Sequence, residues 1–183
     1  SDLGWLNKKL AKKTRVIFGD IEDLSFLTNL MKNIDVVVNL AALISIPYSY
    51  ESSKSYITTN ILGTYNILEA SKKNKVKKII LTSTSEVYGS AKYTPIDEKH
   101  ILQPQSPYSA SKIAADQIGL SYYNSFNLPV IIARPFNTFG PRQSTRAVIP
   151  SIITQMLSKS KFIKIGDVNT KRDFSYVEDT ADF

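Results

Sequence analysis

The chain has 183 residues, no cysteine and one histidine, and its formal net charge is +7. These counts exclude a disulfide framework, thiolate metal sites and a histidine metal cluster, so we expect no metal. No apolar run approaches the ~18 residues that would span a membrane, and residues 1–14 lack the apolar segment of a signal peptide, which predicts a cytoplasmic protein.

The positive charge comes mainly from lysine and gathers in two clusters. The first lies between Lys8 and Lys13, and the second lies between Lys72 and Lys78 at a predicted helix end, where cations suit the helix dipole. A basic chain can bind nucleic acid or an acidic membrane, but no zinc finger, recognition helix or aromatic RNA-binding motif accompanies these lysines. We therefore interpret them as solvated surface, with no nucleic-acid partner and no membrane partner.

Short β-branched runs alternate with longer helical patterns up to residue 134. Strands are predicted at 14–18, 35–40, 78–82 and 128–134, and helices at 21–32, 52–73 and 107–126. Each strand is a nearly continuous apolar run, which is typical of a parallel sheet buried on both faces. The alternating order predicts an α/β fold with a doubly wound parallel sheet.

The alternation stops after Arg134. A loop rich in Pro, Asn and Gly leads to a predicted helix at 147–158 and a short strand at 162–165, so we divide the chain at residue 142. The seven glycines do not form the G-x-G-x-x-G pattern that opens a dinucleotide-binding unit. Either the chain is not such a protein, or its first βαβ unit is missing.

Tyr108 and Lys112 stand four residues apart near the start of a predicted helix, so their side chains share one helix face. A neighbouring ammonium favours a phenolate and lowers the pKa of a tyrosine, so Tyr108 can act as a base toward a substrate hydroxyl, tuned by Lys112. An ordinary surface pair has the same spacing, and the motif alone does not decide between the two.

A hydroxyl-rich segment, Thr82-Ser-Thr-Ser-Glu-Val-Tyr-Gly89, directly follows a predicted strand. Ligands of open α/β sheets bind beyond the carboxyl ends of strands, where hydroxyls and Glu86 can supply hydrogen bonds and acid–base chemistry. The alternative is a Ser/Thr-rich turn that satisfies its own backbone.

Four further segments lie where strands end or in the loops beyond them. They are 19–21, 39–42, 134–142 and 172–179. A carboxylate can accept from an adenine or ribose, small residues allow a ligand close to the backbone, and arginines suit phosphates. The alternatives are a helix cap, helix–sheet packing and surface ion pairs.

In this order and spacing, the motifs resemble the extended short-chain dehydrogenase/reductase family, the NAD-dependent epimerases and dehydratases of nucleotide sugars. The resemblance covers essentially the whole chain, from just after the family's glycine-rich loop to a point inside its substrate domain. It implies a partial Rossmann-like NAD-binding domain at 1–142, without its first βαβ unit, and the start of a substrate-binding region at 143–183. It also implies a homodimer, with the helices at 52–73 and 107–126 as candidates for the interface.

The resemblance assigns roles residue by residue. The residues implied to bind NAD are Asp20, Ile21, Leu40, Ala41, Ala42, Asn60, Thr82, Tyr108, Lys112, Pro135 and Phe136. The residues implied to be catalytic are Thr84, Ser85, Glu86, Tyr108 and Lys112. The residues implied to contact the nucleotide-sugar substrate are Thr84, Asn137, Arg142, Val148 and Arg172.

Glu86 favours a 4,6-dehydratase, because the dehydratases that this chain resembles carry S-T-D-E-V-Y-G where it has Ser83-Thr-Ser-Glu-Val-Tyr-Gly89. Ser85 replaces their aspartate, a pattern shared with nucleotide-glucuronate decarboxylases. The segments at 46–50, 107–112 and 143–150 look most like bacterial amino-sugar 4,6-dehydratases, including those of legionaminic-acid synthesis.

The resemblance thus implies NAD-dependent 4,6-dehydration of a nucleotide-linked hexosamine in polysaccharide biosynthesis. Tyr108 would take the O4 proton, Glu86 would take the C5 proton, and water would leave from C6. Decarboxylation of a nucleotide-uronate and 4-epimerisation are the alternatives in the same family. The alternative outside it is an inactive or partner-dependent binding domain, and we expect that these 183 residues alone do not turn over substrate.

Overall fold

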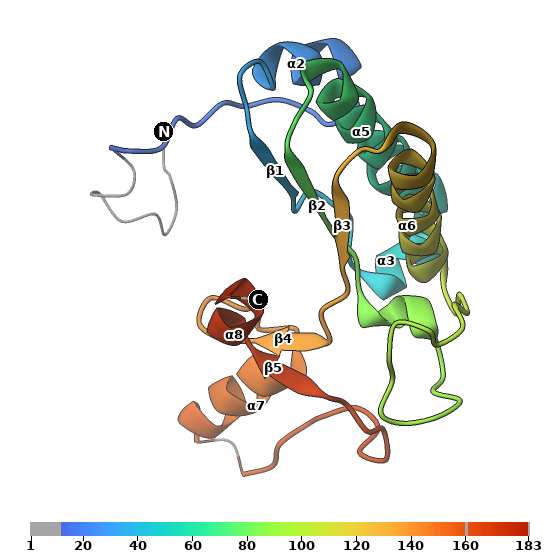
Figure 1. Cartoon of the computed structure of the whole chain (residues 1–183). Coiled ribbons are helices and arrows are strands. Elements are labelled where there is room, and N and C mark those ends of the chain that lie inside the picture. Colours follow the sequence, from blue (N-terminus) through green and yellow to red (C-terminus); the bar gives the residue numbers. More distant parts are fainter. Residues whose placement is uncertain (1–11, 160, 183) are drawn as a thin grey trace.

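The structure, a computed structural model, describes residues 12–159 and 161–182. Lys8 and Lys9 of the first lysine cluster lie outside the described residues, as does most of the segment searched for a signal peptide. An α/β unit is followed by a smaller lobe at the C-terminal end (Figure 1). Within the two described ranges, no helix has the length and apolarity needed to cross a membrane.

The α/β unit contains a sheet of three parallel strands in the order β1-β2-β3. The strands are β1 (Val36–Asn39), β2 (Lys78–Thr82) and β3 (Val130–Ala133). They lie where the β-branched runs predicted strands, and helical segments connect them. The prediction of a parallel, Rossmann-like α/β fold is therefore confirmed.

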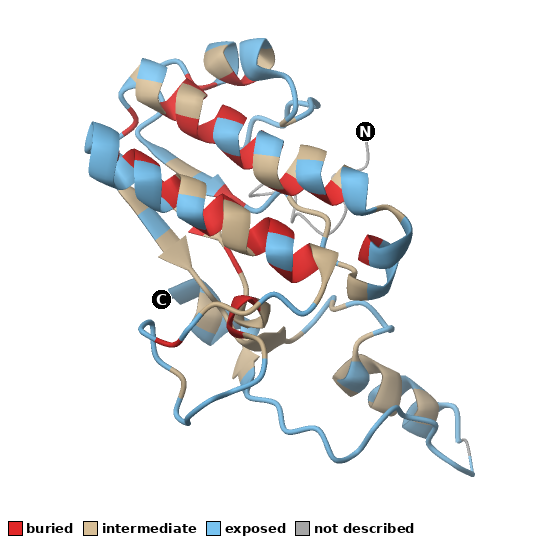
Figure 2. Ribbon diagram, turned by 90° about the vertical axis from the view of Figure 1, so that its right-hand side faces the viewer, coloured by how far each residue is buried: buried red, intermediate tan, exposed pale blue. Residues whose placement is uncertain are grey.

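Helices of very different lengths connect these strands. They are α2 (Leu24–Leu30), α3 (Ile46–Glu51), α4 (Ser53–Tyr56), the π-helix η1 (Ile57–Leu62), α5 (Gly63–Asn74), the 3-10 helix η2 (Ser85–Tyr88) and α6 (Pro107–Phe126). The single helix predicted at 52–73 is thus three consecutive segments. α5 and α6 run side by side and cover one face of the sheet (Figures 1 and 2).

Helix α6, which carries the Tyr108 and Lys112 pair, has the bounds that the sequence predicts. Ser106 is its N-cap and forms a capping box with Ser109, and Pro107 occupies the first helical position. Asn127 ends the helix in the left-handed conformation, with φ of 52°. Local sequence therefore fixes both ends of the element that positions the candidate catalytic pair.

The core lies between the sheet and helices α5 and α6. Val37, Ile79 and Val130 are paired in register and pack toward Leu68 and Tyr122. This cluster holds the sheet against the two helices by apolar burial.

The opposite face of the sheet corrects the expectation that the strands are buried on both faces. On that face, Val38, Ile80 and Ile131 are paired in register, and Val38 and Ile131 are 52% and 49% exposed. Val36, on the same face, is 51% exposed. The reason is that α2, α5 and α6 all lie on the other side of the sheet (Figure 1).

Two predicted strands are wrong. Residues 14–18 and 162–165 form no strand, because a strand needs a hydrogen-bonded neighbour as well as β-branched residues. Phe18 is 81% exposed. Near Lys164, the chain bonds instead to the side chain of Gln155, which accepts from the Lys164 N–H and donates to its carbonyl.

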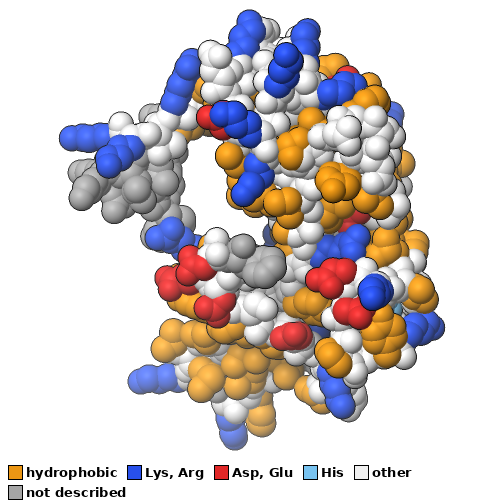
Figure 3. All heavy atoms as spheres, viewed as in Figure 1, with side chains coloured by type: hydrophobic (Ala, Val, Ile, Leu, Met, Phe, Trp, Pro, Cys, Tyr) orange, Lys and Arg blue, Asp and Glu red, His pale blue; other side chains and the backbone are white. Residues whose placement is uncertain are grey.

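The smaller lobe is built on a parallel pair of strands, β4 (Asn137–Phe139) and β5 (Phe174–Tyr176), that the sequence did not predict. Helices α7 (Val148–Leu157) and α8 (Val177–Asp182) complete it. Hydrophobic side chains gather on this lobe in Figure 3. β4 precedes residue 142 and its partner β5 follows it, so this small sheet contains residues from both sides of the predicted domain boundary. The domain division at residue 142 stays a prediction.

Candidate functional site

The candidate site lies at the carboxyl ends of β2 and β3. Thr82 ends β2 and is paired with Ala133 at the end of β3. The turn η2 follows β2 directly, and the first half of α6 packs beside it. The structure therefore brings the hydroxyl-rich segment and the Tyr108 and Lys112 pair together from two distant parts of the sequence.

Tyr108 is 7% exposed and lies in the first turn of α6. Its ring meets that of Tyr56 edge-on, with 6.2 Å between centroids. Burial raises the pKa of Tyr108, the Thr84 hydroxyl lowers it, and the nearby Glu86 carboxylate raises it further. The sequence predicted a lowered pKa, so the direction of the net shift was wrong: desolvation outweighs the stabilisation expected from Lys112.

Lys112 is also 7% exposed, and its Nζ donates a hydrogen bond of 2.6 Å to the carbonyl of Thr82. Burial lowers the pKa of Lys112, and the carboxylate of Asp116 raises it. The ammonium is therefore anchored at the end of β2, close to the turn that carries Thr84 and Glu86.

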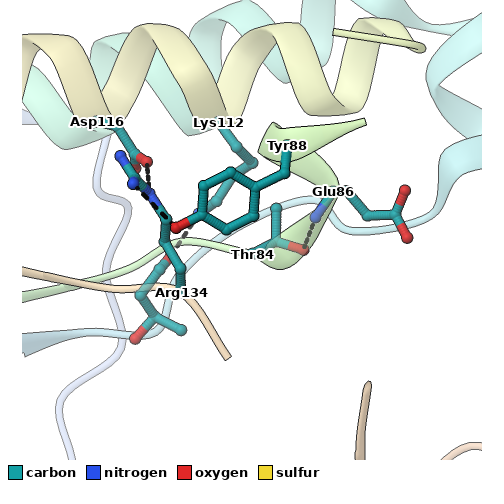
Figure 4. A network of polar contacts seen from close by, with 7 residues as sticks. Thr84, Glu86, Tyr88, Lys112, Asp116 and Arg134 are labelled. Carbon is teal, nitrogen blue, oxygen red and sulfur yellow. Dashed lines mark hydrogen bonds and ion pairs between the residues drawn. The ribbon is translucent and has the colours of Figure 1, made fainter. Parts of the chain in front are cut away.

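The turn η2 is held in place by short-range contacts. The Thr84 hydroxyl accepts from the Glu86 N–H at 3.2 Å and caps the turn. The Ser85 N–H donates to the carbonyl of Pro135 at 3.1 Å, so the segment after β3 supports the turn as well. The half-buried Glu86 points its carboxylate away from Arg134 and Asp116 (Figure 4).

A buried network behind the turn joins three elements, and the sequence analysis missed it. Asp116, on α6, accepts from Nε of Arg134 at 2.8 Å, and Nη1 of Arg134 donates to the Tyr88 hydroxyl at 3.2 Å. The available signal was the spacing Tyr108-x-x-x-Lys112-x-x-x-Asp116, which places a third functional group on the same helix face.

The loop after β1 is tied to α6 through Asn60, which is 1% exposed within η1. The Asn60 side chain accepts from the Leu43 N–H at 2.9 Å and donates to the Leu43 carbonyl at 3.0 Å. It also donates to the Ser111 hydroxyl at 2.9 Å. Asn60 therefore holds the loop beside the helical turn between Tyr108 and Lys112, and its contact with a cofactor stays a prediction.

Three predicted cofactor-binding residues lie in that loop. Leu40 is 75% exposed, Ala41 is exposed and Ala42 is half-buried. Two of the three side chains are methyl groups, and the Ala41 N–H donates to Oδ1 of Asn39 at 3.1 Å.

The predicted adenine-binding pair lies at the end of the N-terminal extended segment. Asp20 is exposed, and its Oδ1 accepts from the Glu22 N–H at 2.9 Å. Ile21 packs against the small apolar cluster around Leu27 and Met31. The N-cap of α2 is Asp23, so Asp20 is not needed to begin that helix.

The other predicted ligand-binding residues lie in and around the smaller lobe. Pro135 and Phe136 precede β4, and Asn137 begins it and donates from both its backbone and side chain to the Asp173 carbonyl. This contact places Asn137 next to the segment that carries Arg172. Arg142 adopts φ of 75° in the following loop, and Val148 begins α7 and is 45% exposed.

Comparison with known proteins connects this geometry to one group of enzymes. The family model described as GDP-mannose 4,6 dehydratase matches residues 3–183. The dTDP-D-glucose 4,6-dehydratase of Dictyostelium discoideum is 40% identical over 174 residues, which are 88% of this chain and 40% of that protein.

Two solved structures share the fold closely. The UDP-N-acetylglucosamine 4-epimerase of Methanobrevibacter ruminantium M1 superimposes with a TM-score of 0.90 at 35% identity, over 97% of this chain and 58% of the other. A dTDP-glucose 4,6-dehydratase of Streptomyces venezuelae, solved with NAD bound, gives 0.83 at 31% identity, over 90% of this chain and 51% of the other. The chain spans about half the length of the curated relatives it matches.

Proposed function

Because this chain belongs to the GDP-mannose 4,6-dehydratase family of NAD-dependent nucleotide-sugar dehydratases and epimerases, we propose that it is the catalytic part of a nucleotide-sugar 4,6-dehydratase. The observation that carries the proposal is the placement of Tyr108 and Lys112 beside the turn that holds Thr84 and Glu86, at the carboxyl end of the sheet. An amino sugar is the preferred substrate class, supported by the sequence resemblance at 46–50, 107–112 and 143–150.

The residues present fit the two ends of an NAD molecule. The loop from Leu40 to Ala42 and the anchored Lys112 can together receive the ribose of the cofactor, because Asn60 ties the loop to α6 between Tyr108 and Lys112. The exposed carboxylate of Asp20 can accept from the adenosine end. The printed sequence contains no glycine-rich helix start for the pyrophosphate. Bound NAD would supply the redox chemistry, as the acceptor of the C4 hydride that is later returned to C6.

The protein's own groups would move the protons. Tyr108, as a phenolate that the Lys112 ammonium stabilises, takes the proton of the O4 hydroxyl and becomes a neutral phenol. The 4-keto group then acidifies the C5 proton, which Glu86 removes as water leaves from C6. The Thr84 hydroxyl assists Tyr108 by binding the O4 hydroxyl of the substrate. Ser85 occupies the place of the dehydratase acid and can hold a water there, and Glu86 itself is the candidate to protonate the leaving hydroxyl with the proton taken from C5. When the hydride is returned to C6, C5 takes up a proton from solvent, which would introduce deuterium at C5 in heavy water.

Glu86→Gln tests this assignment. In a polypeptide that carries this sequence at its native length, the variant should lose C5 deuterium exchange and product formation by about 10²- to 10⁴-fold, the usual contribution of a general acid–base residue. Mass spectrometry and NMR of the sugar product measure both. Thr180→Val, on α8, is a control of similar size away from the turn. Unchanged exchange in Glu86→Gln would show that Glu86 is not the C5 base.

Decarboxylation is the second candidate, because Ser85 stands where the dehydratases carry an aspartate. Loss of a C6 carboxylate from a 4-keto uronate needs no C5 base. A panel of nucleotide-linked hexosamines, hexoses and uronates separates the two reactions: a 4-keto-6-deoxy product supports dehydration, and a pentose product supports decarboxylation. The cytoplasmic location also stays a prediction.

We further propose a homodimer formed through the outer faces of η1, α5 and α6. Its support is the set of exposed apolar side chains there, including Leu62, Tyr65 and Leu120, which are 43%, 39% and 44% exposed. The long helices α5 and α6 lie side by side and present one continuous face (Figure 2).

A further inference from the structure

A network of buried polar side chains lies behind the turn that carries Glu86 (Figure 4). Asp116 is 2% exposed, and the Arg134 side chain is 18% exposed. Taking both charges out of water is costly, and replacing such a pair by apolar residues is often neutral or stabilising. Stability alone therefore explains this pair poorly, and its position relative to the candidate site offers a better reason for it.

Lys112 and the network hold the segment from the end of β2 to the end of η2 at two points. At its start, Lys112 binds the carbonyl of Thr82. At its end, Arg134 donates to the Tyr88 hydroxyl and its guanidinium stacks over the Tyr88 ring, 5.3 Å from the centroid. Thr84 and Glu86, the two groups proposed to meet the substrate from this turn, lie between these points.

Tyr88 itself has little freedom to move. It is 3% exposed, and on another side its ring meets the ring of His100 edge-on at 5.5 Å. Its position is therefore fixed relative to Arg134, which α6 holds in turn through Asp116. A displacement of Arg134 would be transmitted to the backbone of η2, two residues from Glu86.

The network also sets the charge around the catalytic pair. Asp116 lies one helical turn beyond Lys112 and two beyond Tyr108, so its carboxylate acts on both groups from the same helix face. It raises the pKa of Lys112 and also that of Tyr108. Burial raises the pKa of Asp116 itself, which Ser83, Arg134 and Lys112 lower. Tyr56 and Glu86 are the other titratable groups that face Tyr108.

We propose that Asp116, Arg134 and Tyr88 form a positioning unit that fixes the Glu86 turn against α6 and balances the charge around Tyr108 and Lys112. The proposal rests on the proposed function, since it assigns these residues to the same reaction. None of the three needs to touch the reacting atoms. Arg134 sets the geometry of the turn, and Asp116 supplies both the anchor for Arg134 and the negative charge.

The two parts of the unit can be separated by substitution. Arg134→Lys keeps the charge but loses the planar fork that binds Asp116 and Tyr88 together. It should slow C5 exchange about tenfold, as expected for a displaced catalytic group, and leave the pH profile of kcat unmoved. Tyr88→Phe keeps the stacked ring and loses only one hydrogen bond, so it should slow exchange by only about threefold.

Asp116→Asn should slow exchange about tenfold and also move the pH profile. Without the carboxylate, the pKa of Tyr108 falls, so the limb of the profile that Tyr108 controls moves to lower pH. The pKa of Lys112 falls as well, so a limb that Lys112 controls moves the same way. NMR titration of ¹³Cζ-labelled tyrosine, with Tyr108→Phe to assign the signal, measures the first of these shifts without any substrate.

Two further variants of this protein complete the experiment. The double variant Asp116→Asn with Arg134→Gln removes both buried charges, so it should regain thermal stability while exchange stays slow and the pH limbs stay shifted. Asp35→Asn removes the carboxylate of an exposed ion pair with Lys77 and should match the unmodified protein in every measurement.

The outcomes distinguish this inference from the proposed function. If the unmodified protein forms no keto sugar from any nucleotide sugar, the proposed function fails, and an unmoved Tyr108 titration in Asp116→Asn would overturn the charge role independently. If the unmodified protein is active and Asp116→Asn lowers only the melting temperature, the proposed function stands and the unit is merely structural. A double variant with the unmodified rate and profile would also overturn the inference.

Discussion

At the scale of single residues, burial controls the chemistry of the site. Tyr108 and Lys112 are both nearly inaccessible to solvent. Desolvation favours the neutral form of each group, so it raises the pKa of the phenol and lowers the pKa of the amine. Both shifts favour the uncharged groups, so forming the Tyr108 phenolate costs more free energy here than at the surface, and the Thr84 hydroxyl opposes this by lowering the pKa of Tyr108.

Asn60 gives a prediction at the same scale. Asn60→Ala leaves both backbone groups of Leu43 without their side-chain partner and should lower the free energy of unfolding by ~2–3 kcal/mol, as measured by urea denaturation. It should also weaken NAD binding, measured by calorimetry, because the loop from Leu40 to Ala42 loses its tie to α6.

The matched control is Asn29→Ala, since the Asn29 side chain donates only to an exposed carbonyl within its own helix. Its effects on stability and NAD affinity should be close to zero. An Asn60→Ala variant that is less stable but binds NAD normally would show that Asn60 supports the fold and not the cofactor surface.

At the scale of elements, the short turn η2 positions the proposed catalytic groups of the segment after β2. The turn η2 has four residues and carries Thr84 just before it and Glu86 within it. It ends at Gly89, where φ is 63° and ψ is −142°. A Cβ at this position would lie 2.6 Å from the carbonyl oxygen of Gln103. Only glycine can close the turn in this way, so the conformation of one residue determines where the turn ends.

Gly89→Ala should therefore lower the free energy of unfolding by about 2 kcal/mol, the order of magnitude for a strained backbone. Chemical denaturation measures it. Gly166→Ala is the control, because no atom lies within 4 Å of the added methyl group. If both variants unfold at the same denaturant concentration, the turn is less constrained than its geometry implies.

The sequence predicted those elements that local chemistry specifies. The capping box and Pro107 mark the start of α6, and β-branched runs mark β1, β2 and β3, so these four were located correctly. β4 and β5 have three residues each and exist because they pair across more than thirty residues of sequence, which no local pattern records. Residues 14–18 show the converse, with strand composition and no strand.

The candidate site was predictable to a similar extent. Tyr108, Lys112, Thr84 and Glu86 follow from motifs, and the structure brings them together. The contact of Asp116 with Arg134 did not follow, because it joins residues of different elements. The direction of the Tyr108 pKa shift was also missed, since a sequence does not show how deeply a side chain is buried.

At the scale of the whole molecule, the distribution of exposed apolar surface gives a prediction about assembly. Leu120→Glu, on the outer face of α6, should place a charge in the proposed dimer interface and shift sedimentation velocity from dimer to monomer. Leu157→Glu makes the same change on α7, where the side chain is 79% exposed, and should leave the mass unchanged. A dimer that survives Leu120→Glu would place the interface elsewhere.

The π-helix η1 has a consequence of its own. A π-helical turn accommodates one more residue than an α-helical turn, so it rotates the preceding helix by about 100° relative to the following one. Asn60 lies within this π-helical segment and contacts Leu43 and Ser111. The number of residues in the segment Ile57–Leu62 therefore sets the direction of the Asn60 side chain. Substitutions at its exposed positions preserve the angular offset. Deleting one residue would turn the asparagine away from both partners, although every remaining side chain would be chemically unchanged.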